Sequence, residues 1–213
     1  MLSKIKGFLL LQNESFDFVF DSDQILNLCI VVIFLSCISG AIHPFLIESN
    51  NLSFELSEFL SKFIALIAQN LFIISGIYFI GVSFFANKIR IGITDDNKII
   101  EDNNFNVLNI RRMFQLLSLS QITVLIGMLS VIPGINNISF LVSWIVAIST
   151  IWFYILVTKS IYVGFGFNFE SNSTKQIRYV KSFLIVLFTY IPGTIIFQLF
   201  ISSLIKNLIN IWI

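Results

Sequence analysis

The chain has 213 residues, of which 56% are hydrophobic and only 12% are charged. Soluble domains carry about 25% charged residues, so half that share together with 24 Phe side chains excludes a soluble globular protein. The net charge of +1 leaves no basic surface for nucleic acid, which excludes that class of partner.

Residues 1–25 precede the first apolar run and have their own pattern. The apolar residues of the first turns fall on one side of a helix and the two lysines fall elsewhere: Leu2, Ile5, Phe8 and Leu9 against Lys4 and Lys6. This pattern predicts a short amphipathic helix in the membrane interface, followed by an acidic lead-in. The apolar stretch GFLLL is too short for a secretory signal, so we expect no cleavage there.

Runs of about 20 apolar residues follow, and each can cross a hydrocarbon layer of about 30 Å. We place them at 26–47, 63–86, 113–132, 140–162 and 182–205. Pro44 is expected to interrupt the first run near its end, Pro133 and Gly134 to end the third, and Pro192 lies within the fifth. The sequence therefore predicts an all-α fold, a transmembrane bundle of about five spans that forms a single domain over residues 26–213.

The only long hydrophilic stretch is the insert at 87–112, where TDDNK separates two short apolar-containing runs that could pair as a hairpin. With the N-terminus in the cytoplasm, eleven basic residues fall on the cytoplasmic side and only Lys62 and Lys206 fall outside. Positive charge favours the cytoplasmic side. We therefore expect an odd number of spans, a cytoplasmic N-terminus and insert, and an external C-terminus.

Two adjacent amides, Gln69 and Asn70, interrupt the apolar sequence of the second span. On a helical wheel, Gln69 shares a stripe with small residues, which is typical of a helix-packing contact. Asn70 points to nearly the opposite side, where it is either covered by another helix or faces a cavity. Intramembrane polar groups are otherwise a functional hypothesis by default.

Three further residues would join these amides if the bundle enclosed a polar cavity: Gln121, Tyr154 and Pro192. Pro192 removes a helical hydrogen bond, which could produce a hinge, although a static kink explains it as well. These residues are therefore candidates either for helix packing or for a cavity near Asn70 and Pro192.

No motif for catalysis is present: the chain has no Gly-rich phosphate loop, no H-E-x-x-H and no G-x-S-x-G. With one histidine, His43, and two cysteines, a metal site is not expected, and no cofactor is expected. Cys29 and Cys37 lie eight residues apart on one predicted helix, too far for a disulfide. Lys159, near the cytoplasmic end of the fourth span, can reach the interface with its long side chain.

A basic cluster flanks the polar insert and could bind anionic lipid or an acidic partner: Lys88, Arg90, Arg111 and Arg112. Ordinary cytoplasmic positive charge is the alternative explanation. Four acidic residues within the insert dilute the basic charge, which favours a protein partner over plain lipid.

The layout of the chain resembles the prokaryotic members of the Yip1-domain family. The likeness rests on the lead-in LLQNESFDFVFDSDQIL, on IRRMFQLLSLSQITVLIGML after the polar insert, on the tight third hairpin, and on WFYILVTKSIYVGFGF before the last span. The chain has Asn13-Glu14 where members often have Asn-Pro, and it lacks the eukaryotic D-L-Y-G-P motif. The resemblance implies five spans, a cytoplasmic N-terminus, no catalytic residues, and a role in membrane organisation or trafficking.

The sequence thus predicts a non-enzymatic integral membrane protein that acts as a scaffold or docking protein. Its expected partners are the lipid bilayer and other membrane proteins or a second copy of itself. Two alternatives stay open: an accessory subunit of a larger membrane complex, and a small transporter or channel-like protein. The expected location is a bacterial or archaeal cytoplasmic membrane rather than a eukaryotic endomembrane.

Overall fold

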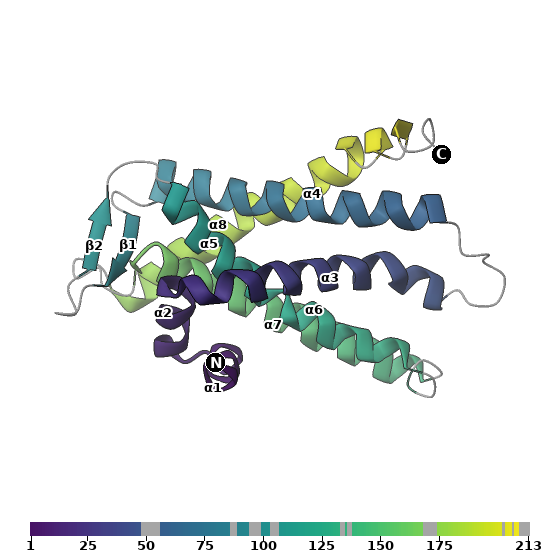
Figure 1. Cartoon of the computed structure of the whole chain (residues 1–213), viewed down its shortest axis with the longest axis horizontal. Helices are drawn as coiled ribbons and strands as arrows, with labels where there is room; N and C mark the ends of the chain where they lie inside the picture. The colour runs from purple at the N-terminus through teal and green to yellow at the C-terminus, as the bar shows by residue number, and fades with distance from the viewer. Residues whose placement is uncertain are drawn as a thin grey trace.

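In the computed structural model the chain forms a bundle of long helices with a small two-stranded hairpin at one end (Figure 1). The structure describes residues 1–47, 56–85, 89–93, 99–102, 107–132, 135, 138–167, 174–201, 203–205 and 207–208. Its helices and strands are α1 (Leu2–Leu9), α2 (Asn13–Asp21), η1 (Asp23–Ile25), α3 (Leu26–Ile47), α4 (Leu56–Ile80), η2 (Gly81–Phe85), β1 (Ile89–Ile93), β2 (Ile99–Asp102), α5 (Val107–Ser120), α6 (Ile122–Gly127), η3 (Met128–Val131), α7 (Ser139–Gly164), α8 (Lys175–Ile196) and η5 (Phe197–Ile201).

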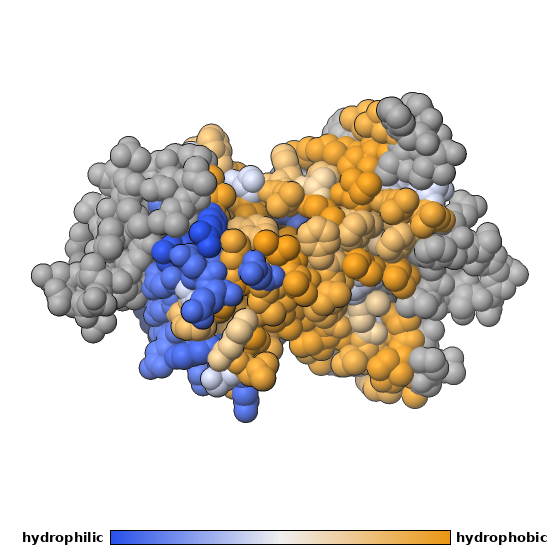
Figure 2. Space-filling view, in the orientation of Figure 1, coloured by the Kyte–Doolittle hydropathy of each residue, from blue (hydrophilic) through white to orange (hydrophobic). Residues whose placement is uncertain are grey.

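Within the part of the chain that the structure describes, five helical segments are long and apolar enough to cross a membrane, which confirms the predicted number of spans. They are Asp23–Ile42, Leu56–Phe85, Asn109–Val131, Ser139–Gly164 and Lys175–Ile205. The spans pack in a closed ring: α3 contacts α4, α4 contacts α8, α8 contacts α7, and α7 contacts α5 and α6, which return to α3. Their outward faces are hydrophobic over most of the visible surface, whereas hydrophilic residues gather at the end where α1 and α2 lie (Figure 2). The chain is a multi-pass integral membrane protein.

The boundaries of the first two spans differ from the sequence prediction. The first span is not interrupted at Pro44, since α3 continues to Ile47; the proline costs the helix its own N–H bond to the carbonyl four residues back without ending it. The second helix begins at Leu56 rather than at residue 63, and its first turns contain a Lys62–Glu58 ion pair of 2.7 Å. Polar first turns therefore extend the helix beyond its apolar run.

The third span is divided at Gln121 rather than continuous. Gln121 N bonds to the carbonyl of Ser118, three residues back, and the hydroxyls of Ser120 and Thr123 bond to the Leu116 and Ser120 carbonyls. Such side-chain bonds to nearby backbone compete with the regular helical pattern and bend the helix. The break separates α5 from α6 and leaves the Gln121 side chain directed at α4.

The N-terminal segment is part of the same hydrophobic core as the spans. Phe8 of α1 and Phe16 of α2 are fully buried and stack at 4.2 Å between ring centroids. Gly7 permits this approach, since a Cβ on it would lie 2.1 Å from Ser15 Oγ. Trp152 Nε1 of α7 donates to the Leu9 carbonyl at 3.1 Å, which fastens the end of α1 to the fourth span.

The polar insert contains the short hairpin expected around TDDNK. β1 and β2 pair antiparallel, and β1 contacts both α2 and α5. The hairpin lies at the same end of the bundle as α2 and the start of α8, whereas the end of α8 lies toward the opposite end (Figure 1).

Candidate functional site

Asn70 lies at a junction of three spans. Its Nδ2 donates to the Leu66 carbonyl at 3.0 Å within α4 and to Cys37 Sγ of α3 at 3.4 Å. Its Oδ1 accepts from Gln121 Nε2 at 2.8 Å. The amide therefore has partners on both sides, from α3 and from the break between α5 and α6.

The space beside Asn70 and Gln121 is very small. It measures about 10 Å³ and is walled mainly by apolar side chains, among them Ile73 and Leu117, together with Tyr190. One water needs about 10–15 Å³, so this space holds no more than a single water. The contacts of Asn70 are those expected of an amide that joins helices.

The other three candidate residues lie apart from this junction. Gln69 lines an outer groove of about 230 Å³ with Lys62 and Gln198. Tyr154 lines two separate grooves on α7, and Pro192 is exposed on the outside of α8. The structure therefore brings Asn70 and Gln121 together but does not gather all five residues around one cavity.

Tyr154 and Tyr190 meet on the inner side of α7 and α8. Their rings lie 5.4 Å apart in an edge-to-face contact, and Phe153 packs against both. Beside them is a groove of about 360 Å³ to which α3 contributes Ser39 and Gly40. Aromatic packing of this geometry stabilises the contact between the two helices.

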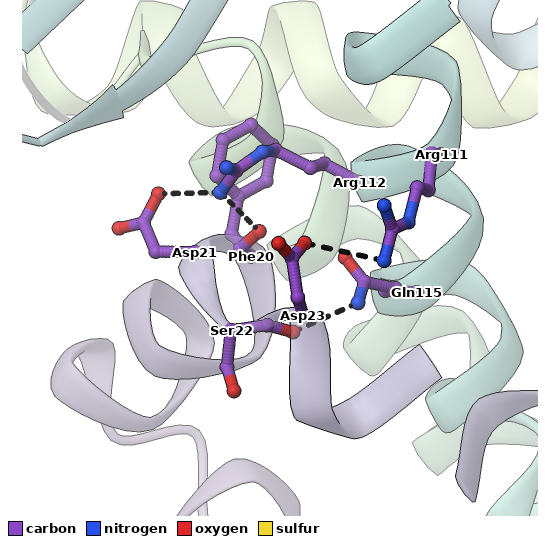
Figure 3. Close-up of polar contacts among 7 residues, drawn as sticks. All are labelled: Phe20, Asp21, Ser22, Asp23, Arg111, Arg112 and Gln115. Atoms are coloured by element: carbon purple, nitrogen blue, oxygen red, sulfur yellow. Dashed lines mark hydrogen bonds and ion pairs between the residues drawn. The ribbon is translucent and has the colours of Figure 1, made fainter. Parts of the chain in front are cut away.

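Two arginines that sequence reasoning assigned to docking are used to hold the N-terminal segment against α5 (Figure 3). Arg112 Nη1 donates to the Phe20 carbonyl at 2.9 Å and to Asp21 Oδ1 at 3.1 Å, and its guanidinium lies 5.6 Å from the Phe20 ring centroid. Arg111 Nη2 lies 3.2 Å from Asp23 Oδ1. We call this set of contacts the arginine clasp.

Gln115, one turn beyond the arginines, completes the connection. Its side-chain Nε2 donates to the Ser22 carbonyl at 2.9 Å (Figure 3). Its backbone carbonyl accepts from Cys29 Sγ of α3 at 3.3 Å. Helix α5 is thereby bound both to the end of α2 and to the first turn of α3. Cys29 and Cys37 are free and buried.

Two docking candidates remain, Lys88 and Arg90. Lys88 lies outside the described residues, and Arg90 is in β1, where only the backbone is described. The strand that carries Arg90 contacts α2 and α5 next to the arginine clasp.

Lys159 forms a second cationic site with two tyrosines between α7 and α8. The sequence analysis expected of this lysine only that its side chain would reach the membrane interface. Lys159 is 7% exposed, and its Nζ donates to Tyr179 Oη at 3.0 Å. The Nζ also lies 4.9 Å from the Tyr162 ring centroid and 5.5 Å from that of Tyr179, and the two rings stack at 4.2 Å. The sequence does contain a signal for this site: a lysine within an apolar span is costly to bury and therefore needs partners.

Within the part of the chain that the structure describes, no three His, Cys, Asp or Glu side chains lie together as a metal ion would require. No protein-family model, curated protein or solved structure matches the chain.

Proposed function

We propose that this protein is a non-enzymatic membrane scaffold that docks a partner at one end of its bundle. The docking region would be the N-terminal platform, by which we mean α1, α2, the β1–β2 hairpin and the first two turns of α5. As in the Yip1-domain proteins that the layout resembles, the role would lie in membrane organisation or trafficking.

The observation that carries this proposal is the arginine clasp. The Arg112 side chain on α5 is only 14% exposed and makes three contacts to α2. Strand β1 of the hairpin also contacts both α2 and α5. Hydrogen bonds that involve a charged group are the strong ones. A segment outside the spans that is fastened in this way presents a preformed surface, which lowers the entropic cost of binding a partner.

The use of polar groups inside the spans supports a scaffold over the transporter alternative. Asn70 and Gln121 bond to each other, and the space beside them measures about 10 Å³. A transport pathway through these amides would need a wider polar space around them, and the groove of about 360 Å³ beside Tyr154 and Tyr190 is lined by neither Asn70 nor Gln121. The exposed apolar faces of the spans could contact either lipid or a neighbouring subunit. The crosslinking experiment described below therefore tests the accessory-subunit alternative together with the scaffold.

We further propose that the platform faces the cytoplasm and that the membrane is a bacterial or archaeal cytoplasmic membrane. The orientation rests on the basic residues, since α1, the start of α5, the end of α7 and the start of α8 carry most of the described lysines and arginines. The choice of membrane rests on the resemblance alone.

Site-specific photo-crosslinking in cells tests the docking proposal. A photoreactive residue replaces Asn13 or Glu14, which are exposed on α2 of the platform, and a control replaces Ser139 at the far end of α7. We expect a discrete crosslinked protein from the platform positions only. Crosslinks solely from a lipid-facing position such as Ile151 would favour an accessory subunit, and their absence from every position would contradict a docking role.

A further inference from the structure

Lys159 lines a groove at the surface of the bundle. It measures about 510 Å³ and lies between α7 and α8, with Leu11 of the α1–α2 turn on a third side. The Trp152–Leu9 hydrogen bond holds that turn against α7. Three separate segments therefore form the groove.

The walls change from polar to apolar along the groove. On α7, Ile155 and Ile151 lie one and two turns before Lys159, so all three fall on the same side of the helix. On α8, Phe183 lies one turn beyond Tyr179. Because the two helices run in opposite directions, both progressions lead from the polar end toward the middle of the bundle.

Lys159 lies at the depth at which lipid headgroups begin. Helix α7 has 26 residues and is therefore roughly 39 Å long at about 1.5 Å per residue, and Lys159 is five residues from its end. The hydrocarbon layer is about 30 Å thick, so the ammonium is near its edge rather than at its centre. The exposed side chains of Ile151 and Phe183 face the region of the acyl chains.

The charge of Lys159 is not matched by the residues around it. Its contacts are one hydrogen bond to Tyr179 Oη and the faces of two tyrosine rings, all of them neutral. Among the described residues no carboxylate pairs with it, and two of its three ammonium protons have no hydrogen-bond acceptor. A buried cation in an apolar environment is stabilised by an opposite charge.

We propose that this groove binds an anionic phospholipid, with the headgroup phosphate at Lys159 and Tyr179 and an acyl chain along Ile151, Ile155 and Phe183. The phosphate would accept hydrogen bonds from the free ammonium protons and from the tyrosine hydroxyl. The lipid would thereby bridge α7, α8 and the α1–α2 turn. This inference does not depend on the docking proposal.

Native mass spectrometry of the purified full chain with phosphatidylglycerol or phosphatidylcholine tests the inference. We expect the wild type to retain one phosphatidylglycerol with an affinity about tenfold higher than Lys159→Gln, and Lys159→Arg to restore the preference. Lys175→Gln removes the same charge from an exposed position at the same end and should bind as the wild type does. Equal retention of the two lipids by the wild type, or unchanged binding by Lys159→Gln, would overturn the proposal.

A second variant keeps the test informative if Lys159→Gln does not fold. Ile155→Trp fills the groove without altering its charge and should reduce phosphatidylglycerol retention to a similar degree. Inorganic phosphate should neither compete nor stabilise the chain, because it lacks the acyl part. Retention by Ile155→Trp equal to that of the wild type, or competition by inorganic phosphate, would count against a lipid site.

Discussion

Gln121 Nε2 lies 2.8 Å from Asn70 Oδ1, so two side-chain amides from different spans form a direct hydrogen bond inside the bundle. The bond forms where the third span is broken, which leaves Gln121 directed at α4. This contact joins the second and third spans and therefore influences how they pack. Its energetic contribution can be measured.

Replacing Asn70 with Leu should lower the free energy of unfolding by about 0.5–2 kcal/mol, the range of hydrogen bonds between membrane helices. Gln121→Leu should lower the free energy of unfolding by a similar amount, and the double variant should lose less than the sum of the two, since each change removes the same hydrogen bond. Reversible unfolding in mixed micelles gives the values. Gln69→Leu is the matched control, because in the described part of the chain Gln69 makes no hydrogen bond, and its effect should be small. Equal losses for Asn70 and Gln69 would argue against this role.

The arginine clasp predicts different consequences for two neighbouring arginines. Arg112→Gln should cost about 1.5–3 kcal/mol, because it removes charged hydrogen bonds to Phe20 and Asp21. Arg111→Gln should cost less than about 1 kcal/mol, since its partner Asp23 is 66% exposed. Hydrogen exchange of the amides in α2 is the direct measurement, with faster exchange expected in the Arg112 variant only. Equal acceleration in both variants would show that Arg112 has no special role.

Two glycine substitutions should have effects of opposite sign. Gly7→Ala should destabilise the chain by about 1–3 kcal/mol, because the new Cβ would overlap Ser15 and separate α1 from α2. Gly76→Ala should stabilise it by roughly 0.5–1 kcal/mol, since Gly76 is helical and nothing lies within 4 Å of the new Cβ. Thermal unfolding of the two variants tests this. A stabilised Gly7 variant would contradict the close contact of α1 with α2.

The expected orientation can be tested by cysteine labelling. Cys29 and Cys37 are buried, so they should not react with a membrane-impermeant maleimide in the folded protein. Single cysteines at the exposed positions Ser3, Lys175 and Ser139 then report the sides of the membrane. In intact cells only Ser139→Cys should be labelled, and lysis should expose the other two. Labelling of Ser3→Cys in intact cells would reverse the orientation.

The sequence predicted the number of spans well, because length and hydropathy alone decide whether a helix can cross a bilayer. It did not locate the break at Gln121, which depends on how the hydroxyls of Ser120 and Thr123 bond to the backbone. It also gave the N-terminal segment only an interfacial role, although Phe8 and Phe16 are fully buried. Burial of that kind depends on contacts with helices far along the chain.

For the site residues, too, the sequence indicated the polar side chains but not their partners. The helical wheel placed Gln69 and Asn70 on different sides of the helix, but the partner of Asn70 is 51 residues away and no local pattern identifies it. The cluster of basic residues singled out Arg112, but the sequence did not identify its partner Asp21, which is 91 residues away. Both arginines were expected to be available for docking, and the structure instead joins them to the N-terminal segment. Residue type indicates which side chains need partners, and the fold decides which partners they obtain.

Purification of a tagged chain at native expression, in a gentle detergent, followed by mass spectrometry of the intact complex, tests the docking role most directly. We predict a stoichiometric partner that is lost when a short Gly-Ser linker replaces residues 89–102, while the five-span bundle stays folded. A lone chain would contradict a docking role. If the partner is retained without the hairpin, its binding site lies on the spans and not on the hairpin of the platform.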